Sequence, residues 1–354
     1  MPDSLKNMMP LFPGSIRRAV ATLAVIVACC LPSCAQTVDG PALGYVLNPN
    51  NHSLHRVLGV EGAAVAASEA RMLSVLLPLA VSPRGEYVLV LSGEERRLAV
   101  WTSADPSRPR TIDGLPANPD RVVLSPEGHA FAALYRSENR IVTVSGLPGA
   151  GAPVTAFEIE RFSIGSSREA PGFALSDDGT LLLTSSSEPD SDASRVSSSV
   201  VVWGTGSDLK PAELNRVKLF GPVTAMAFAS GSHDAIVASD SEAFIVRGID
   251  SQGLTIRIAT DGLGPISAAA ISPDGTQALL LSAASSQVAA FHIDSATPAV
   301  SILKCNCSPV GLERVGASTV YNLTPYDGSV SWMLDLSGET PRIVSVSSAP
   351  APEK

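Results

Sequence analysis

A short turn that recurs along the chain constrains the fold more than any other feature of the sequence. Its clear copies start with Ser and place Gly three positions later, and they are Ser82-Pro83-Arg84-Gly85, Ser125-Pro126-Glu127-Gly128, Ser176-Asp177-Asp178-Gly179 and Ser272-Pro273-Asp274-Gly275. Pro at the second position pre-sets φ and Gly at the fourth eases the entry into a strand, so the pattern predicts type I β-turns. With weaker copies at Gly231 and Gly316, the turn glycines are 43, 51, 52, 44 and 41 residues apart, so the chain repeats a unit of about 46 residues.

The segments between the turns have the patterns of short strands. Runs such as Tyr87–Leu91 and Ala278–Leu281 are apolar on both faces, as expected for strands packed between neighbouring sheets. Later runs, such as Leu254–Ile258, alternate polar and apolar residues, which suits an outermost strand with one wet face. A period in the forties with several strands per unit predicts an all-β fold, a β-propeller of four-stranded antiparallel blades. Residues 36–354 hold about seven periods, so seven blades are favoured, with six or eight as alternatives.

Over residues 43–348 the chain resembles bacterial β-propeller proteins of the broad YVTN and WD-repeat type. The resemblance rests on the turns and on Trp101, Trp203 and Trp332 near the ends of third strands. No Trp is followed by Asp, and no Gly-His pair opens a repeat, so the structural network of true WD repeats is absent. The tandem Trp-containing repeats of quinone-dependent dehydrogenases are also missing. The resemblance therefore implies an architecture and no activity.

The way in which the ring closes is less directly encoded. Six units begin at turn-linked strand pairs, which leaves Leu43–Leu47 and Leu54–Val60 as a third and fourth strand without their first two. We expect this piece to share the seventh blade with the C-terminal runs Val330–Leu334 and Arg342–Val346. In the alternative it lies over a six-bladed ring.

The N-terminus has the order of regions found in a secretory signal peptide. Arg17 and Arg18 precede the apolar run Ala19–Leu31, which is too short to span a bilayer, and small residues follow. Ser33 and Ala35 fit the positions before a cleavage site, which predicts a signal peptide over 1–35 and a mature chain starting at Gln36. In the competing interpretation Leu31–Cys34 is a lipobox and Cys34 is lipidated, which would anchor the protein to the envelope.

Composition limits the classes of partner. Cleavage at Ala35 removes three basic residues and one acidic residue from a chain of net charge −9, which leaves −11. An acidic surface argues against nucleic-acid binding. No stretch after residue 35 is long and apolar enough for a transmembrane helix. The sequence thus predicts an exported protein, periplasmic or extracellular, with one propeller domain over 36–354 and a short disordered tail at 349–354.

Cys305 and Cys307 are the only thiols left after cleavage at Ala35. Cysteines that lie close together tend to pair in an oxidising compartment, and the adjacent Ser308-Pro309 favours a turn that would bring them within bridging distance. A local disulfide is favoured. Two separate thiols, or a metal or redox role, are the alternatives, although two sulfurs do not complete the shell of a structural zinc.

No other motif gives a catalytic, cofactor or metal site. His52 and His55 are expected in a loop, and the acidic group Glu188, Asp190 and Asp192 in a solvated insert. None of the remaining candidates is expected on an innermost strand. His129 and His233 follow turns, His292 lies in a third strand, and the turns themselves contain Asp177, Asp178 and Asp274. We assign none of them a catalytic role, because Asp in a turn bonds local amides.

The sequence therefore predicts an exported, non-enzymatic propeller that acts as a protein or ligand interaction scaffold, with a protein partner in the cell envelope and no cofactor. The expected binding surfaces are the loops at 146–153 and 185–199, because propellers bind through loop-built surfaces. The alternative is a lactonase-like hydrolase with its site at the mouth of the central channel, which rests on analogy of fold alone.

Overall fold

The structure is a computed structural model that describes residues 41–48, 51–70, 72–149, 154–158, 172–189, 196–205, 211–251, 253–294, 300–325 and 330–347. The chain divides into two units, Met1–Gly40 and Pro41–Lys354. The predicted signal peptide, the alternative lipidation site Cys34 and the tail at 349–354 lie outside the described residues. In the described part of the chain no helix is both long enough and apolar enough to cross a membrane.

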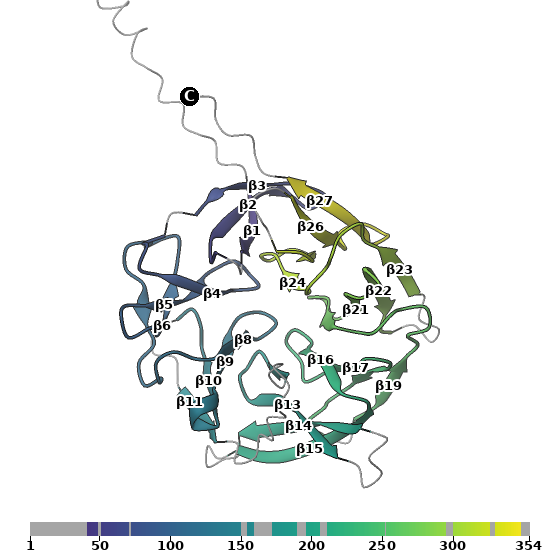
Figure 1. Ribbon diagram of the computed structural model, residues 1–354. Helices are drawn as coiled ribbons and strands as arrows, with labels where there is room; N and C mark the ends of the chain where they lie inside the picture. Colours follow the sequence, from purple (N-terminus) through teal and green to yellow (C-terminus); the bar gives the residue numbers. More distant parts are fainter. Residues whose placement is uncertain are drawn as a thin grey trace, which may run out of the picture. The chain divides into compact units, whose positions relative to one another are not determined.

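The second unit is a seven-bladed β-propeller, as the repeat predicts (Figure 1). Every blade is an antiparallel sheet that runs from an inner strand at the channel to an outer strand. The strands of blades 1 to 3 are β1 Ala42–Leu47, β2 Leu54–Val60 and β3 Ala63–Glu69; β4 Leu77–Val81, β5 Val88–Ser92, β6 Arg97–Trp101 and β7 Arg110–Thr111; β8 Arg121–Leu124, β9 Ala130–Tyr135, β10 Arg140–Ser145 and β11 Val154–Glu158. A 3₁₀ turn, Arg136–Glu138, links β9 to β10.

Blade 1 has three strands, and blades 4 to 7, like blades 2 and 3, have four strands each. The strands of blades 4 to 7 are β12 Phe173–Leu175, β13 Leu181–Pro189, β14 Val196–Thr205 and β15 Pro211–Phe220 in blade 4; β16 Val223–Phe228, β17 Ala235–Ser239, β18 Ala243–Val246 and β19 Thr255–Ile258 in blade 5; β20 Ala268–Ile271, β21 Gln277–Ser282, β22 Gln287–His292 and β23 Val300–Lys304 in blade 6; β24 Glu313–Arg314, β25 Val320–Asn322, β26 Val330–Asp335 and β27 Arg342–Ser347 in blade 7.

The recurring turn joins the first strand of a blade to the second, as its chemistry predicts. In blade 6 the Ser272 amide donates to the Gln277 carbonyl at 2.8 Å, and Gly275 adopts the positive φ of +71° that favours glycine. The Asp274 carboxylate accepts from the Ser272 hydroxyl and from the Thr276 amide and hydroxyl. The second strands that follow are the most buried of the fold, and all six residues of β9 are buried. The core therefore lies between the blades.

The N-terminal strands form a blade of their own, so the expected shared blade is wrong. β1, β2 and β3 make one sheet with no strand from the C-terminal segment, whose four strands form blade 7. β1 is an inner strand, because Tyr45 lines the channel and its ring packs edge-on against Trp101 of blade 2 at 6.4 Å between centroids. The expectation failed because the β1–β2 turn, which begins at Asn48, lacks the Ser and Gly that mark the other turns.

Ring closure is instead a contact between blades 1 and 7, which lie side by side at the end of the chain (Figure 1). The backbones of Gly44 in β1 and Gly316 in blade 7 approach so closely that a Cβ on Gly44 would lie 2.7 Å from the Gly316 amide nitrogen. Glu61, between β2 and β3, accepts from the Thr319 amide at 2.8 Å and from its hydroxyl at 3.0 Å. Two blades thus close the ring by packing and side-chain bonds.

The segment 185–199, expected as a loop, belongs largely to a β-hairpin. β13 and β14 have nine and ten residues and pair from Leu181↔Gly204 to Pro189↔Val196. Nine residues of β15 pair with β14, with a register shift that skips Leu214. In β14 the serines of this segment run directly into the apolar residues Val200–Trp203 of the same strand. The polar segment therefore lengthens the sheet of blade 4. The other expected loop is described only up to Gly149, and its Leu147 is buried.

Candidate functional site

The central channel contains a cavity of about 540 Å³. Inner strands of all seven blades line it, together with the beginnings of several turns. A shared hydrogen bond aligns the blades: the first turn residue donates its amide to the carbonyl five residues later, as Ser82 does to Tyr87 and Val315 to Val320 at 2.9 Å each. Channel positions can therefore be compared from blade to blade.

One channel position differs in chemistry between the blades. The residue two places before the first turn residue is small and apolar in six blades and acidic in blade 7; the set is Val46, Ala80, Val123, Ala174, Ala227, Ala270 and Glu313. Glu313 is exposed to the channel, and its side chain forms no hydrogen bond or ion pair with any described residue. The channel walls around Glu313 reduce the hydration of its carboxyl, and this desolvation raises its pKa.

A second channel position, two residues farther from the turns than that of Glu313, is positively charged in one blade. Four places before the first turn residue, blade 3 carries Arg121, whereas the other blades have Gly44, Pro78, Gly172, Ala225, Ala268 and Gly311. The Arg121 guanidinium lies over the Phe173 ring at 5.5 Å from its centroid. Burial and the nearby charge of Arg136 lower the pKa of Arg121. No described residue pairs with its charge.

At the level of the turns a bridge of side chains crosses the channel. The Arg314 guanidinium of blade 7 lies 2.7 Å from the Glu127 carboxylate of blade 3, which also accepts from the Ser230 hydroxyl of blade 5 at 2.9 Å. Burial acts to raise the pKa of Glu127, but the bonds from Arg314 and Ser230 outweigh it and lower the pKa. These bonds link blades 3, 5 and 7 to one another.

A second pocket, of about 280 Å³, lies beside the turns of blades 3 to 5 and is lined by His129, Asp177, Asp178 and His233 among others. His233 Nδ1 lies 2.7 Å from the Asp250 carboxylate, and Nε2 lies 3.1 Å from that of Asp178. Burial acts to lower the pKa of His233, but the two carboxylates outweigh it and raise the pKa. The sequence did not predict this cluster, because its members come from separate blades.

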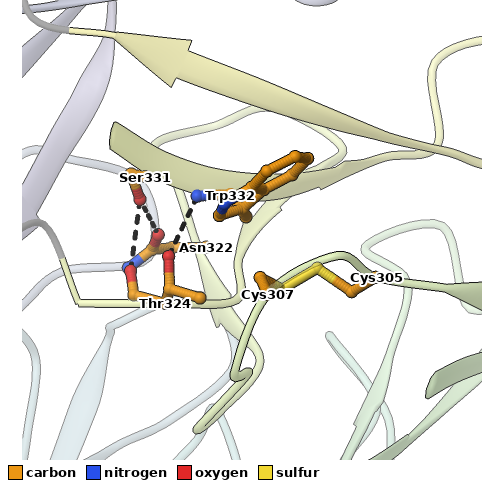
Figure 2. The surroundings of a disulfide bond; sticks show 6 residues. All are labelled: Cys305, Cys307, Asn322, Thr324, Ser331 and Trp332. Carbon is orange, nitrogen blue, oxygen red and sulfur yellow. Dashed lines mark hydrogen bonds between the residues drawn. A yellow bond between two sulfur atoms is a disulfide. The ribbon is translucent and has the colours of Figure 1, made fainter. Parts of the chain in front are cut away.

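The structure places a disulfide between Cys305 and Cys307, whose Cα atoms are 5.1 Å apart (Figure 2). The pair follows β23 and packs with Trp332 in the core between blades 6 and 7. Beside it the buried Ser331 hydroxyl donates to Asn322 at 2.6 Å and to the Thr324 carbonyl at 3.1 Å. These bonds satisfy the buried polar groups of blade 7 beside the disulfide, which itself packs in the core.

Apart from the second pocket and the disulfide, the candidates from the sequence do not come together in a site. His52, His129 and His292 are exposed, and His55 contacts the Ser53 hydroxyl at 2.8 Å. Asp274 bonds its own turn, as expected, whereas Asp178 bonds both its own turn and His233. The Glu188 side chain, Asp190 and Asp192 lie outside the described residues. Among described residues no group of three or more His, Cys, Asp or Glu side chains could hold a metal ion.

Sequence reasoning missed Glu313 and Arg121. A signal for Glu313 was available: it lies two residues before the weak turn at Val315-Gly316, where the aligned blades carry Ala or Val. Arg121 could be found in the same way from the turn at Ser125.

Comparisons with known proteins define the fold and no activity. No family model and no curated protein matches the chain. A candidate 6-phosphogluconolactonase of Bacteroides uniformis is 16% identical with a TM-score of 0.56, over 86% of this chain and 96% of that one. A candidate 6-phosphogluconolactonase of Bacteroides fragilis is 13% identical with a TM-score of 0.50, over 89% and 97%. A protein of unknown function from Desulfotomaculum acetoxidans is 14% identical with a TM-score of 0.51, over 86% and 100%.

Proposed function

We propose that this propeller is an exported, non-catalytic interaction scaffold with a protein partner in the cell envelope. The pattern of residues 1–35 supports export, and the bonds between Glu127, Arg314 and Ser230 support a structural role for the charged groups at the turns. One observation carries the proposal. The outer strand of blade 4 is unusually long and exposes apolar side chains.

That strand, β15, has ten residues, whereas the outer strands β19, β23 and β27 have four, five and six. It pairs with β14 on one side only, and no described strand pairs with its other edge. Two of its amides are already bonded by side chains, since Arg216 donates to the Asn215 side chain and Phe220 to the Glu242 carboxylate, so the edge is only partly capped. Phe220 is 74% exposed and Leu214 is 48% exposed. An extended segment of a partner that adds a strand at this edge would satisfy the backbone groups and cover the apolar side chains. Charged neighbours such as Arg216 and Lys218 would limit self-association.

The test is capture of a partner from envelope extract by the immobilised protein. We expect one reproducible partner whose recovery falls about tenfold for the Leu214→Ala/Phe220→Ala double variant, the loss that follows from removing about 1.4 kcal/mol of binding energy. Val75→Ala is the matched control, because Val75 is 68% exposed in the segment between β3 and β4, away from β15. Equal recovery by the double variant would overturn the proposed surface.

The second candidate is the hydrolase, for which His233 and its two carboxylates offer a base. The geometry disfavours it: both ring nitrogens already lie within hydrogen-bond distance of carboxylates, so neither is free to take a proton from a substrate. Assays with sugar lactones, a phosphorylated one included, should show no turnover above buffer. Turnover that disappears in His233→Ala, with folding retained, would establish the hydrolase instead.

A further inference from the structure

Two opposite charges in the central channel have no role in holding the ring. Glu313 occupies a position where six blades carry Ala or Val, so the fold does not require a carboxylate there. Arg121 occupies a position where the other blades are uncharged, three of them with glycine. Charged groups in a cavity wall that the protein itself does not pair are available to a ligand of opposite charge.

The same two blades provide an internal comparison. At the turns, Arg314 of blade 7 and Glu127 of blade 3 meet across the channel at 2.7 Å. Arg121 of blade 3 and Glu313 of blade 7 are the same residue types with the blades exchanged, yet no ion pair joins them. Arg121 stacks on Phe173 instead. The channel therefore keeps one positive and one negative group apart, with apolar walls between them.

Register gives the part of the separation that lies along the channel. In the aligned blades Arg121 and Glu313 are offset by two positions, about 7 Å along a strand, and they belong to blades that face each other across the channel. Each residue of an extended peptide spans about 3.3–3.6 Å. Two or three residues therefore span this offset along the channel, with the α-ammonium group on the side of Glu313 and the α-carboxylate on the side of Arg121. A cavity of about 540 Å³ lies in the range that holds such a molecule.

We propose that the central channel binds a short zwitterionic peptide of two or three residues with small or branched apolar side chains. Glu313 accepts the α-ammonium group, Arg121 binds the α-carboxylate, and wall residues such as Val123 and Ala227 contact the peptide side chains. The site is separate from β15, so peptide binding and partner capture can fail independently. This inference does not rest on the proposed protein partner.

Calorimetric titration of the full chain tests the proposal with the dipeptide Leu-Ala and the tripeptide Leu-Ala-Leu. We expect at least one to bind with a Kd below about 1 mM. N-acetylation and C-terminal amidation of that peptide should each weaken binding about tenfold. Glu313→Gln should weaken binding of the free peptide to the same extent and leave binding of the acetylated peptide unchanged. Arg121→Gln should likewise weaken binding of the free peptide and leave binding of the amidated peptide unchanged. Glu86→Gln, at a surface pair with Arg84, is the control and should bind normally.

Three results would overturn the inference. They are no binding of either peptide at about 5 mM, an affinity that acetylation or Glu313→Gln does not change, and thermal unfolding that shows Glu313 and Arg121 stabilising each other. We expect Glu313→Gln to keep or raise the melting temperature, because it removes a poorly solvated carboxyl. A coupled loss of stability in Glu313→Gln and Arg121→Gln would mean that the two residues pair with each other.

Discussion

Replacement of Gly316 by Ala should open the ring at the contact between blades 1 and 7. Gly316 has φ +62°, and a Cβ there would lie 1.8 Å from the Leu43 carbonyl oxygen and 2.9 Å from its carbon. The left-handed conformation alone costs an Ala about 1–2 kcal/mol. To relieve the clash, β1 must move away from blade 7 by more than 1 Å, since real contacts of a Cβ begin near 3.0 Å. That movement loosens the buried cluster of Val46, Val57 and Val315.

We estimate the second contribution at about 2–3 kcal/mol by comparison with overpacked cores, so Gly316→Ala should lose about 3–5 kcal/mol in total. Gly231→Ala is a matched control, because Gly231 has the same φ of +62° with no atom within 4 Å of the added Cβ. It should lose only the conformational part, about 1–2 kcal/mol. Urea unfolding followed by fluorescence of the three tryptophans would measure both. Equal losses in the two variants would refute closure by close backbone packing.

Three further predictions concern bonds between blades and the disulfide. Arg314→Met should destabilise the protein by about 2–3 kcal/mol, because it leaves the Glu127 carboxylate without its cation. The double variant Arg314→Met/Glu127→Gln should be more stable than Arg314→Met in the same urea titration. Additive losses of stability in the two single variants would contradict the bridge. The pKa of His233 is raised in the folded state, so its pairing stabilises the protein fully below about pH 6.5 and less as the pH rises through the folded pKa. The melting temperature of His233→Ala should therefore fall below that of the parent by more at pH 5.5 than at pH 8.5, a difference worth under about 1 kcal/mol at this partly exposed site, and an equal gap at both pH values would disprove it. Cys305→Ser/Cys307→Ser should lose about 1.5 kcal/mol, because the bridge closes a loop of only three residues; a loss above about 4 kcal/mol would mean that the bond does more than restrain this loop.

Local chemistry explains what could be predicted from the sequence. The Ser-Pro-x-Gly turns, the apolar second strands and the alternating outer strands each depend on neighbours within a few residues, so the repeat predicted the propeller and its favoured number of blades. The turn at Asp274 bonds its own Ser272 and Thr276, as an Asp in a turn is expected to do. The strongest local signals therefore gave the architecture.

Blade 1 and the candidate sites were decided by tertiary structure. β3, with the sequence Ala63–Glu69, has little of the pattern of a buried strand and is defined by its pairing with β2 and its proximity to β27. Ring closure joins Gly44 to Gly316, and the channel bridge joins Glu127 to Arg314, 187 positions apart. Such contacts depend on which blades meet when the ring closes, and no single segment of the chain encodes that. Glu313 and Arg121 face one channel for the same reason: the sequence places each on its own blade, and only the closed ring brings the blades together.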